Sequence, residues 1–412
     1  MMLRTTHRPA GQHFPESDRR RGVIVIFAAA MLLIVIGFAA FTVDTGMVTL
    51  TKGQMQSAAD SAAHAATLEI ARSFGPGGEL TLTEAENLAR QRAVEMVARF
   101  RTGDVVSSVA DEVRDVRVGR RSWDEASQSW VEAWGVSPYN MVEVTVRRTN
   151  ADTTALPMTF AQILGRDDFE LTTTSVAALQ PGVGFVLNPP ATGTSTPPNG
   201  YVPDTIDILP IALDLGSWTD LLDQYYNGTN HGYDDDYAWD ATDGVDDDAS
   251  DGIPEINIYP DLNSSLAPGN RGTVDLGSPN NSTKDLKRQI VYGLNAYDLS
   301  FFPDNKITFD ADGALYLNGD TGISAGIEDS LESIIGHVRA IPIFIEVTGQ
   351  GNNATYTVVK FVGIRVIAVK LSGGPKKRHL TVQPAPFYDS HVLRGKVEVN
   401  VDSILSQPVT IR

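Results

Sequence analysis

The sequence predicts an α+β protein that one N-terminal helix holds in a membrane. Three observations lead to this fold class: an uninterrupted apolar run, an alanine-rich helical segment after it, and Val/Ile-rich segments in the C-terminal third. Because the strands cluster after the helices, we expect antiparallel α+β units and not a βαβ repeat. The predicted order is a cytoplasmic tail (1–22), a transmembrane helix (23–43), a helical stalk (44–103), a small α+β unit (104–180), a Pro/Gly-rich linker (181–203) and an α+β domain that contains an acidic loop (204–412).

The apolar run is long enough to cross a bilayer as a helix. Its 21 residues, VIVIFAAAMLLIVIGFAAFTV, carry no charge and extend about 31 Å at ~1.5 Å per helical residue. Arg19, Arg20 and Arg21 precede the run and Asp44 follows it. Basic residues mark the cytoplasmic side, so we expect a cytoplasmic N-terminus and export of everything after residue 44. The alternative is a cleaved secretory signal, but the run is long for a signal and no A-x-A site follows it.

Composition narrows the classes of function. The 412 residues are enough for roughly two domains with real cores. The chain has no cysteine, which excludes disulfides, thiol nucleophiles and cysteine-based zinc sites. A net charge of −18 argues against binding to nucleic acid and against broad contact with anionic lipid headgroups.

The segment after the apolar run is expected to continue as a helix. Residues 54–71, QMQSAADSAAHAATLEIA, have high helix propensity and contain no Gly or Pro. Ala58, Ala62 and Ala65/Ala66 share one face, and small residues there permit close approach of another helix. That helix belongs either to a second copy of the chain, which gives a homo-oligomer, or to the protein's own folded part.

Further elements follow from periodicity and turn chemistry. A second helix is expected from Thr83, because Thr83-x-x-Glu86 has the form of a capping box. Later helices are predicted over 283–294, with Ser282 as the N-cap, and over 325–338. The predicted strands lie within residues 105–118, 130–134, 141–148, 169–179, 341–349, 354–371 and 392–401, and residues 349–353 turn one pair into a hairpin.

The N-terminal motifs resemble those of a known family. Arg20-Arg21-Gly22, an apolar run ending in Val43-Asp44-Thr45-Gly46, and the segment QSAADSAA over residues 56–63 occur in this order. The pattern is similar to that of the TadE/TadG-like proteins of Flp (tight-adherence) pilus assembly, and it covers about 50 residues. The resemblance implies a single-pass protein of the bacterial inner membrane that works with a pilus or secretion apparatus.

One departure from related pilins concerns processing. Such pilins are cut after a Gly and carry a Glu five residues beyond the cut. In this chain Gly22 is the corresponding position, and the fifth residue after it is Phe27. The resemblance therefore implies a membrane-resident assembly component and not a filament subunit.

Candidate metal chemistry is concentrated in one acidic segment. Between residues 167 and 270 there are 19 Asp or Glu and no Lys or Arg, and ten of these carboxylates lie within residues 233–255. Ca²⁺ takes six to eight oxygen ligands from closely spaced carboxylates and carbonyls around a Gly turn. The candidate calcium ligands are Asp246, Asp248, Asp251 and Glu255. The alternative interpretation is a solvated acidic loop without an ion.

Two enzyme-like patterns have simpler explanations. Gly322-Ile323-Ser324-Ala325-Gly326 fits G-x-S-x-G, but a turn precedes Ser324 where a nucleophile elbow needs a strand. Asp389 and His391, two residues apart, are unsuited to form a catalytic relay, so Ser324 is expected to cap a helix. Asp214-Leu215-Gly216-Ser217-Trp218 resembles the metal-binding start of von Willebrand A domains but lacks both Ser positions of D-x-S-x-S.

The sequence thus predicts a non-enzymatic, membrane-anchored component of a Flp/Tad-type pilus-assembly or secretion apparatus. Its expected partners are the lipid bilayer, Tad/Flp proteins and, through the alanine face, a second copy; calcium is the one cofactor that the pattern admits. The alternative is a membrane-anchored, calcium-stabilised adhesin or surface-binding module. A hydrolase that uses Ser324 is a third hypothesis.

Overall fold

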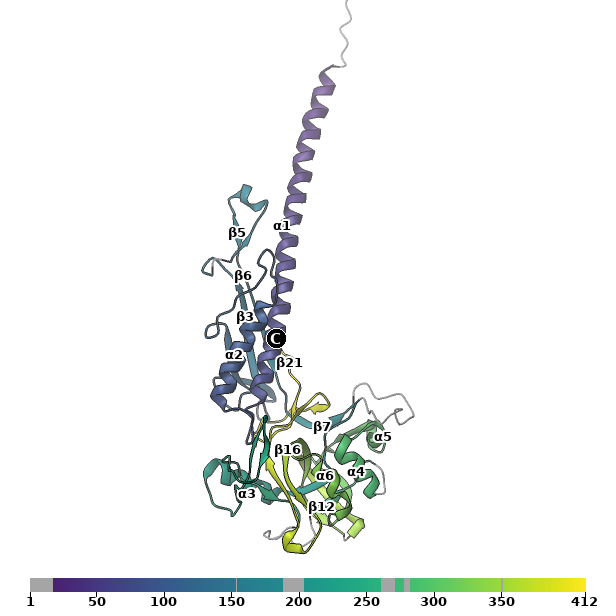
Figure 1. The fold of residues 1–412 in the computed structure, drawn as a ribbon. Coiled ribbons are helices and arrows are strands. Elements are labelled where there is room, and N and C mark those ends of the chain that lie inside the picture. Colours follow the sequence, from purple (N-terminus) through teal and green to yellow (C-terminus); the bar gives the residue numbers. More distant parts are fainter. Residues whose placement is uncertain (1–17, 153, 188–203, 261–270, 278–281, 350) are drawn as a thin grey trace, which may run out of the picture.

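The computed structural model describes residues 18–152, 154–187, 204–260, 271–277, 282–349 and 351–412. It is 31% helix and 32% strand, which confirms the α+β class. One long helix, α1 (Asp18–Ala71), projects from a folded body that contains the strands (Figure 1). Most of the predicted tail and of the predicted linker lies outside the described residues, while residues 182–186 of that linker form strand β7.

The C-terminal half of α1 packs within the first unit of the body. The chain turns at residues 72–81 and returns as α2 (Leu82–Ala98) beside α1. Both helices share a buried cluster with a sheet of order β2-β1-β3-β6-β21. Its strands are β1 (Val116–Asp124), β2 (Ser129–Trp134), β3 (Met141–Arg148), β6 (Leu171–Ala178) and β21 (Val409–Thr410). The predicted stalk and the predicted 104–180 unit therefore share one core.

Helix α2 begins two residues earlier than the sequence predicted. The N-cap is Thr81, whose hydroxyl accepts from the Glu84 N–H while the Glu84 carboxylate accepts from the Thr81 N–H. The segment TLTEAE contains T-x-x-E twice, and the expected box at Thr83 and Glu86 was the wrong one. The earlier box is the one that forms, and Glu86 instead holds Arg90 one turn along the helix.

The second unit is built on a seven-stranded sheet of order β11-β17-β16-β14-β12-β8-β15, and β15 also pairs with β16. All pairings are antiparallel except that of β8 with β15, as expected for an α+β unit. The strands are β8 (Ile211–Asp214), β11 (Ile256–Asn257), β12 (Gly272–Val274), β14 (Leu315–Asp320), β15 (Val338–Thr348), β16 (Ala354–Lys370) and β17 (His379–Pro384).

The remaining elements are short. Most of them surround this sheet, while η1, β4 and β5 form a hairpin beside α1 in the first unit. The α-helices are α3 (Leu215–Asn227), α4 (Thr283–Tyr292), α5 (Ala296–Leu299) and α6 (Glu328–Glu332). The 3₁₀ helices are η1 (Ala161–Leu164), η2 (Pro303–Asn305), η3 (Ala325–Ile327), η4 (Gly351–Asn353) and η5 (Pro375–Lys377). The remaining strands are β4 (Leu156–Pro157), β5 (Asp168–Phe169), β7 (Gly182–Val186), β9 (Ala238–Asp240), β10 (Gly244–Asp246), β13 (Lys306–Thr308), β18 (Tyr388–Asp389), β19 (Val392–Arg394) and β20 (Leu405–Ser406).

The structure confirms some predicted elements and shortens others. The hairpin at residues 349–353 joins β15 to β16, and Ser282 caps α4 by accepting from the Asp285 N–H. The helix predicted over 325–338 is shorter, since α6 ends at Glu332 and Gly336, at φ +81°, turns the chain into β15. The strand predicted over 392–401 is confined to β19.

Candidate membrane anchor and cation-binding loop

The apolar half of α1 has no protein partner. From Ile24 to Val43 its large apolar side chains are 48–71% exposed, and no residue of its most apolar 18-residue window is buried. Among the described residues, α1 is the one helix long and apolar enough to cross a membrane. An exposed apolar surface of this length has a large free-energy cost in water and none in hydrocarbon. The geometry therefore fits a membrane anchor.

Asp44 marks the position where α1 enters the folded body. Its carboxylate is buried and accepts from three successive backbone N–H groups, those of Thr159, Phe160 and Ala161, at 2.7–3.2 Å. These groups form the start of η1, where N–H donors have no partner within the helix. A carboxylate suits this position because it can accept several hydrogen bonds. Asp44 thus fixes the body to the end of the apolar run.

The alanine face of α1 is buried within the chain. Ala58, Ala62 and Ala66 are 0% exposed and pack in the core shared with α2 and the sheet, whereas Ala65 is partly exposed. On an adjacent position, the Thr67 hydroxyl reaches the Ala177 carbonyl of β6 at 3.3 Å. The small residues of this face allow the protein's own helix and strands to approach α1. A homo-oligomer through the alanine-rich helix stays a prediction.

The acidic segment folds back so that three carboxylates converge. Oxygens of Asp235, Asp251 and Glu255 all lie within 4.8 Å of one another. Two of the predicted ligands, Asp251 and Glu255, belong to this group, and Asp235 was not predicted. Asp246 and Asp248 are exposed around the end of the β9–β10 hairpin and are not in the group. Spacing in the sequence missed Asp235 because its 16-residue separation from Asp251 is closed only by that hairpin.

Glu255 is the unusual member of this group. Its side chain is 6% exposed; one oxygen accepts from the Asp236 N–H at 2.9 Å, and the other is buried without a hydrogen-bond partner. Burial, opposed by backbone hydrogen bonds and reinforced by Asp235 and Asp251, raises the pKa of Glu255 to about 7. A buried carboxylate beside two others is stable only when it holds a proton or a cation.

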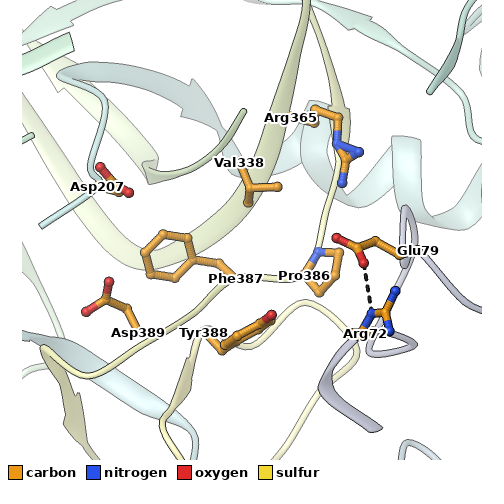
Figure 2. A pocket seen from close by; sticks show the side chains of 9 residues that line it. All are labelled: Arg72, Glu79, Asp207, Val338, Arg365, Pro386, Phe387, Tyr388 and Asp389. Carbon is orange, nitrogen blue, oxygen red and sulfur yellow. Dashed lines mark hydrogen bonds and ion pairs between the residues drawn. The ribbon is translucent and has the colours of Figure 1, made fainter. Parts of the chain in front are cut away.

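A cavity of about 260 Å³ lies between the end of α1 and the second sheet. Figure 2 shows Arg72 and Glu79, paired at 2.9 Å, facing Arg365 from across this space, with Tyr388 to the left of Arg72. Arg365 is 2% exposed, stacks over the Trp239 ring at 3.1 Å, and has two buried guanidinium nitrogens without hydrogen-bond partners. Desolvation lowers the pKa of Arg365 to about 10, so it stays charged at neutral pH. Arg365, on β16, therefore lies between Trp239 of the acidic segment and the residues that follow α1.

Comparison with known proteins gives one match. Residues 22–73 match the family model described as Flp pilus-assembly TadE/G-like. The chain carries a TadE/G-like domain. No curated protein and no solved structure matches the chain. The Tad domain coincides with the apolar half of α1, Asp44 and the buried alanine face, and it supports involvement in Flp pilus assembly.

The Tad family is generally non-enzymatic, and Ser324 has a structural role in this chain. Its hydroxyl accepts from the Gly326 N–H at the start of η3. Asp389 contacts His391 at 2.7 Å. The second ring nitrogen of His391 contacts Asp204 at 2.6 Å, so the ring joins two carboxylates and not a nucleophile. The hydrogen bond to Asp389 raises the pKa of His391, which favours the imidazolium form between these carboxylates.

Asp214 likewise has protein partners. It accepts from the Ser217 N–H at 2.8 Å as the N-cap of α3, and from Arg271 at 2.8 Å. Trp218, at a Ser position of the D-x-S-x-S pattern, is buried and donates to Asp402 at 2.8 Å. The strand-to-helix turn that resembles a metal motif therefore packs the core of the second unit.

Proposed function

We propose that this protein is a non-enzymatic component of a Flp/Tad-type pilus-assembly or secretion apparatus. The apolar half of α1 anchors it in the bacterial inner membrane with a cytoplasmic N-terminus. The rest of the chain is exported and binds envelope or pilus partners. The main support for the proposal is the match of residues 22–73 to the Tad family model. These residues lie on a helix whose first half is apolar and exposed and whose second half is buried in the folded body.

Orientation is testable because the chain contains no cysteine. Single cysteines replace Thr5, in the predicted tail, and Ala126, in the exposed β1–β2 turn. In intact spheroplasts, a membrane-impermeant maleimide is expected to label the Ala126→Cys variant and to label Thr5→Cys only after lysis. The reverse pattern, or labelling of both before lysis, contradicts the proposed topology.

Partner binding requires an exposed surface of suitable chemistry. In α5 and just after it, Tyr297 and Phe301 are 60% and 46% exposed and form an edge-to-face pair at 5.2 Å. Exposed aromatic side chains are enriched where proteins bind one another. We take this pair as the first site to test for binding to pilus-assembly proteins.

The test compares affinity capture of the full chain from its native membranes. Co-purification of pilus-assembly proteins is expected for the wild type and a loss of at least about fivefold for Tyr297→Ser/Phe301→Ser, since one or two interface aromatics contribute on the order of 1–2 kcal/mol. Tyr316→Ser is the matched control, because Tyr316 is 61% exposed on β14. Absence of any such proteins from the wild-type sample overturns the assembly role.

A second candidate function is calcium-dependent stabilisation of the exported part, as in an adhesin or surface-binding module. The supporting observation is the unpartnered buried oxygen of Glu255 beside Asp235 and Asp251. Oxygens bound to one Ca²⁺ at ~2.3–2.6 Å lie no farther apart than about 5 Å, which the three carboxylates satisfy. Backbone carbonyls and water would supply the other ligands.

Calcium binding is measured by the melting temperature of the full chain in detergent at pH 7.5. Millimolar Ca²⁺ is expected to raise the melting temperature of the wild type and of Asp248→Asn by the same amount, and to leave Glu255→Gln unchanged. An Asp248→Asn variant that loses the response, or a wild type that never shows one, rejects the site.

A further inference from the structure

We propose that the hairpin formed by β4, η1 and β5 inserts its tip into the bilayer surface beside α1. It would hold the exported body against the membrane at a second point. This inference rests on the proposed function only in requiring that α1 spans the membrane. The hairpin is closed by the pairs Leu156–Phe169 and Pro157–Asp168, and η1 forms its tip.

The depth of the hairpin is set by Asp44. The last residue of the apolar run is Val43, and the next carboxylate holds the first N–H groups of η1. Among residues 24–43 only Ala40 is partly covered by the protein, one helical turn before Asp44 on the same face. In Figure 1 the hairpin is the part of the body that extends farthest along α1 toward its N-terminal end. The tip therefore lies at the level where the helix leaves the hydrocarbon.

The tip carries an apolar side chain without a protein partner. Ile163 is 82% exposed, the highest value among the exposed large apolar residues of the described chain. Phe169, at the base of the hairpin, is 41% exposed, and Arg166 between them is exposed as well. An apolar tip with a flanking basic residue suits the boundary between headgroups and acyl chains. Single exposed apolar residues are common on protein surfaces. Ile163 differs from them because it lies beside the end of the apolar run of α1.

A second group of exposed apolar residues lies at the same end of the first unit. Val106, Val109 and Val113 are 69–81% exposed in the loop that follows α2. This loop is held to α1 and β3, since the Gly103 N–H donates to Gln54 and the Thr102 carbonyl accepts from Arg148. The end of the body that faces the proposed membrane thus exposes valines as well as Ile163.

The test uses single-cysteine variants in a chain that has no cysteine of its own. A fluorescent nitrobenzoxadiazole label is placed at Ile163→Cys, at Leu33→Cys within the apolar run, and at Ala126→Cys. The last lies in the β1–β2 turn, at the opposite end of β1 from Val116. The full chain is reconstituted into phosphatidylcholine vesicles that carry nitroxide quenchers either near the headgroup or deep in the acyl chain.

We expect the Ile163 label to lose about half of its fluorescence with the shallow quencher and much less with the deep one. The Leu33 label is expected to respond most to the deep quencher and the Ala126 label to neither. An Ile163 label as insensitive as the Ala126 label, together with a quenched Leu33 label, overturns the hairpin contact alone. An unquenched Leu33 label instead overturns the membrane anchor. The two failures are therefore distinguishable.

Discussion

At the scale of single residues, Asp44 links the sequence motif to the structure. In the sequence Asp44 is the acidic residue that follows the apolar run, and its negative charge marks the end of that run. In the structure it accepts hydrogen bonds from the start of η1, which is more than 110 residues away along the chain. No sequence pattern signals that partner, because a cap between distant segments exists only after the chain has folded.

Replacing Asp44 with Asn is expected to destabilise the folded body by ~1–3 kcal/mol. The amide oxygen of Asn accepts hydrogen bonds more weakly than a carboxylate oxygen, and the amide NH₂ group would face the backbone N–H donors of residues 159–161. The melting temperature of the full chain in detergent measures this, with an expected decrease of several degrees. Asp60→Asn is the control, since Asp60 lies on the same helix and bonds to Gln56 one turn away. Equal melting temperatures for the two variants would contradict the proposed role of Asp44.

Glu255 predicts a pH dependence of stability in calcium-free buffer. Burial raises its pKa to about 7, above the ordinary value of 4.5. The folded state therefore binds the proton more tightly than the unfolded state, and this contribution is complete below pH 4.5 and is lost as the pH rises through 7. With a chelator present, the melting temperature is expected to decrease between pH 5 and pH 8.

The Glu255→Gln variant removes this titration and is expected to flatten the pH profile. Melting curves of both proteins at several pH values check it. A wild-type profile that stays parallel to that of the variant across this range would show that Glu255 does not titrate as its burial implies.

At the scale of elements, α1 shows how one helix acquires two environments. Residues 24–43 and 55–70 are both rich in helix-forming apolar residues, yet the first stretch is bare and the second is buried. The sequence predicted the first environment, because a long apolar run without charge has few alternatives. The sequence did not decide the environment of residues 55–70, since a face of small residues can pack equally well against another copy of the chain or against a neighbouring element of the same chain.

Enlarging Ala62 separates these two possibilities. Because Ala62 is 0% exposed in the core between α1, α2 and the sheet, Ala62→Leu is expected to cost ~1–3 kcal/mol by overpacking. Ala65→Leu, at a partly exposed position, is expected to cost much less. Thermal melting measures both variants, and light scattering measures their oligomeric state. Loss of oligomers without a lower melting temperature would assign Ala62 to an interface between copies.

At the scale of the whole molecule, the two ends of the folded body meet. Strand β21, near the C-terminus, pairs with the edge of β6 and completes the sheet that packs on α1. Thr410 contacts His64 of the Tad domain at 2.9 Å, and Arg412 pairs with Glu143 of β3 at 2.9 Å. The first unit therefore depends on contacts between residues as much as 346 positions apart in the sequence.

Deleting residues 409–412 is expected to expose the edge of β6 and to loosen the first unit. Hydrogen exchange of the full-length and truncated chains measures this. Backbone amides near Ala177 and Ala178 should exchange at least about tenfold faster after truncation, because strand edges without a partner open more readily. Amides of β16 in the second unit serve as the internal control. Unchanged exchange in β6 would show that β21 contributes no stability.

Composition and short-range patterns were sufficient to predict the class of fold, the long apolar helix, the family motif and the β15–β16 hairpin. Each of these depends on composition or on neighbours a few residues apart, so local chemistry is sufficient. The folded chain was needed to show which T-x-x-E box caps α2, which carboxylates converge with Glu255, and what covers the alanine face. Those outcomes depend on contacts between segments that are distant along the chain. Such contacts stabilise the protein only after folding has brought the segments together, so local sequence patterns do not reveal them.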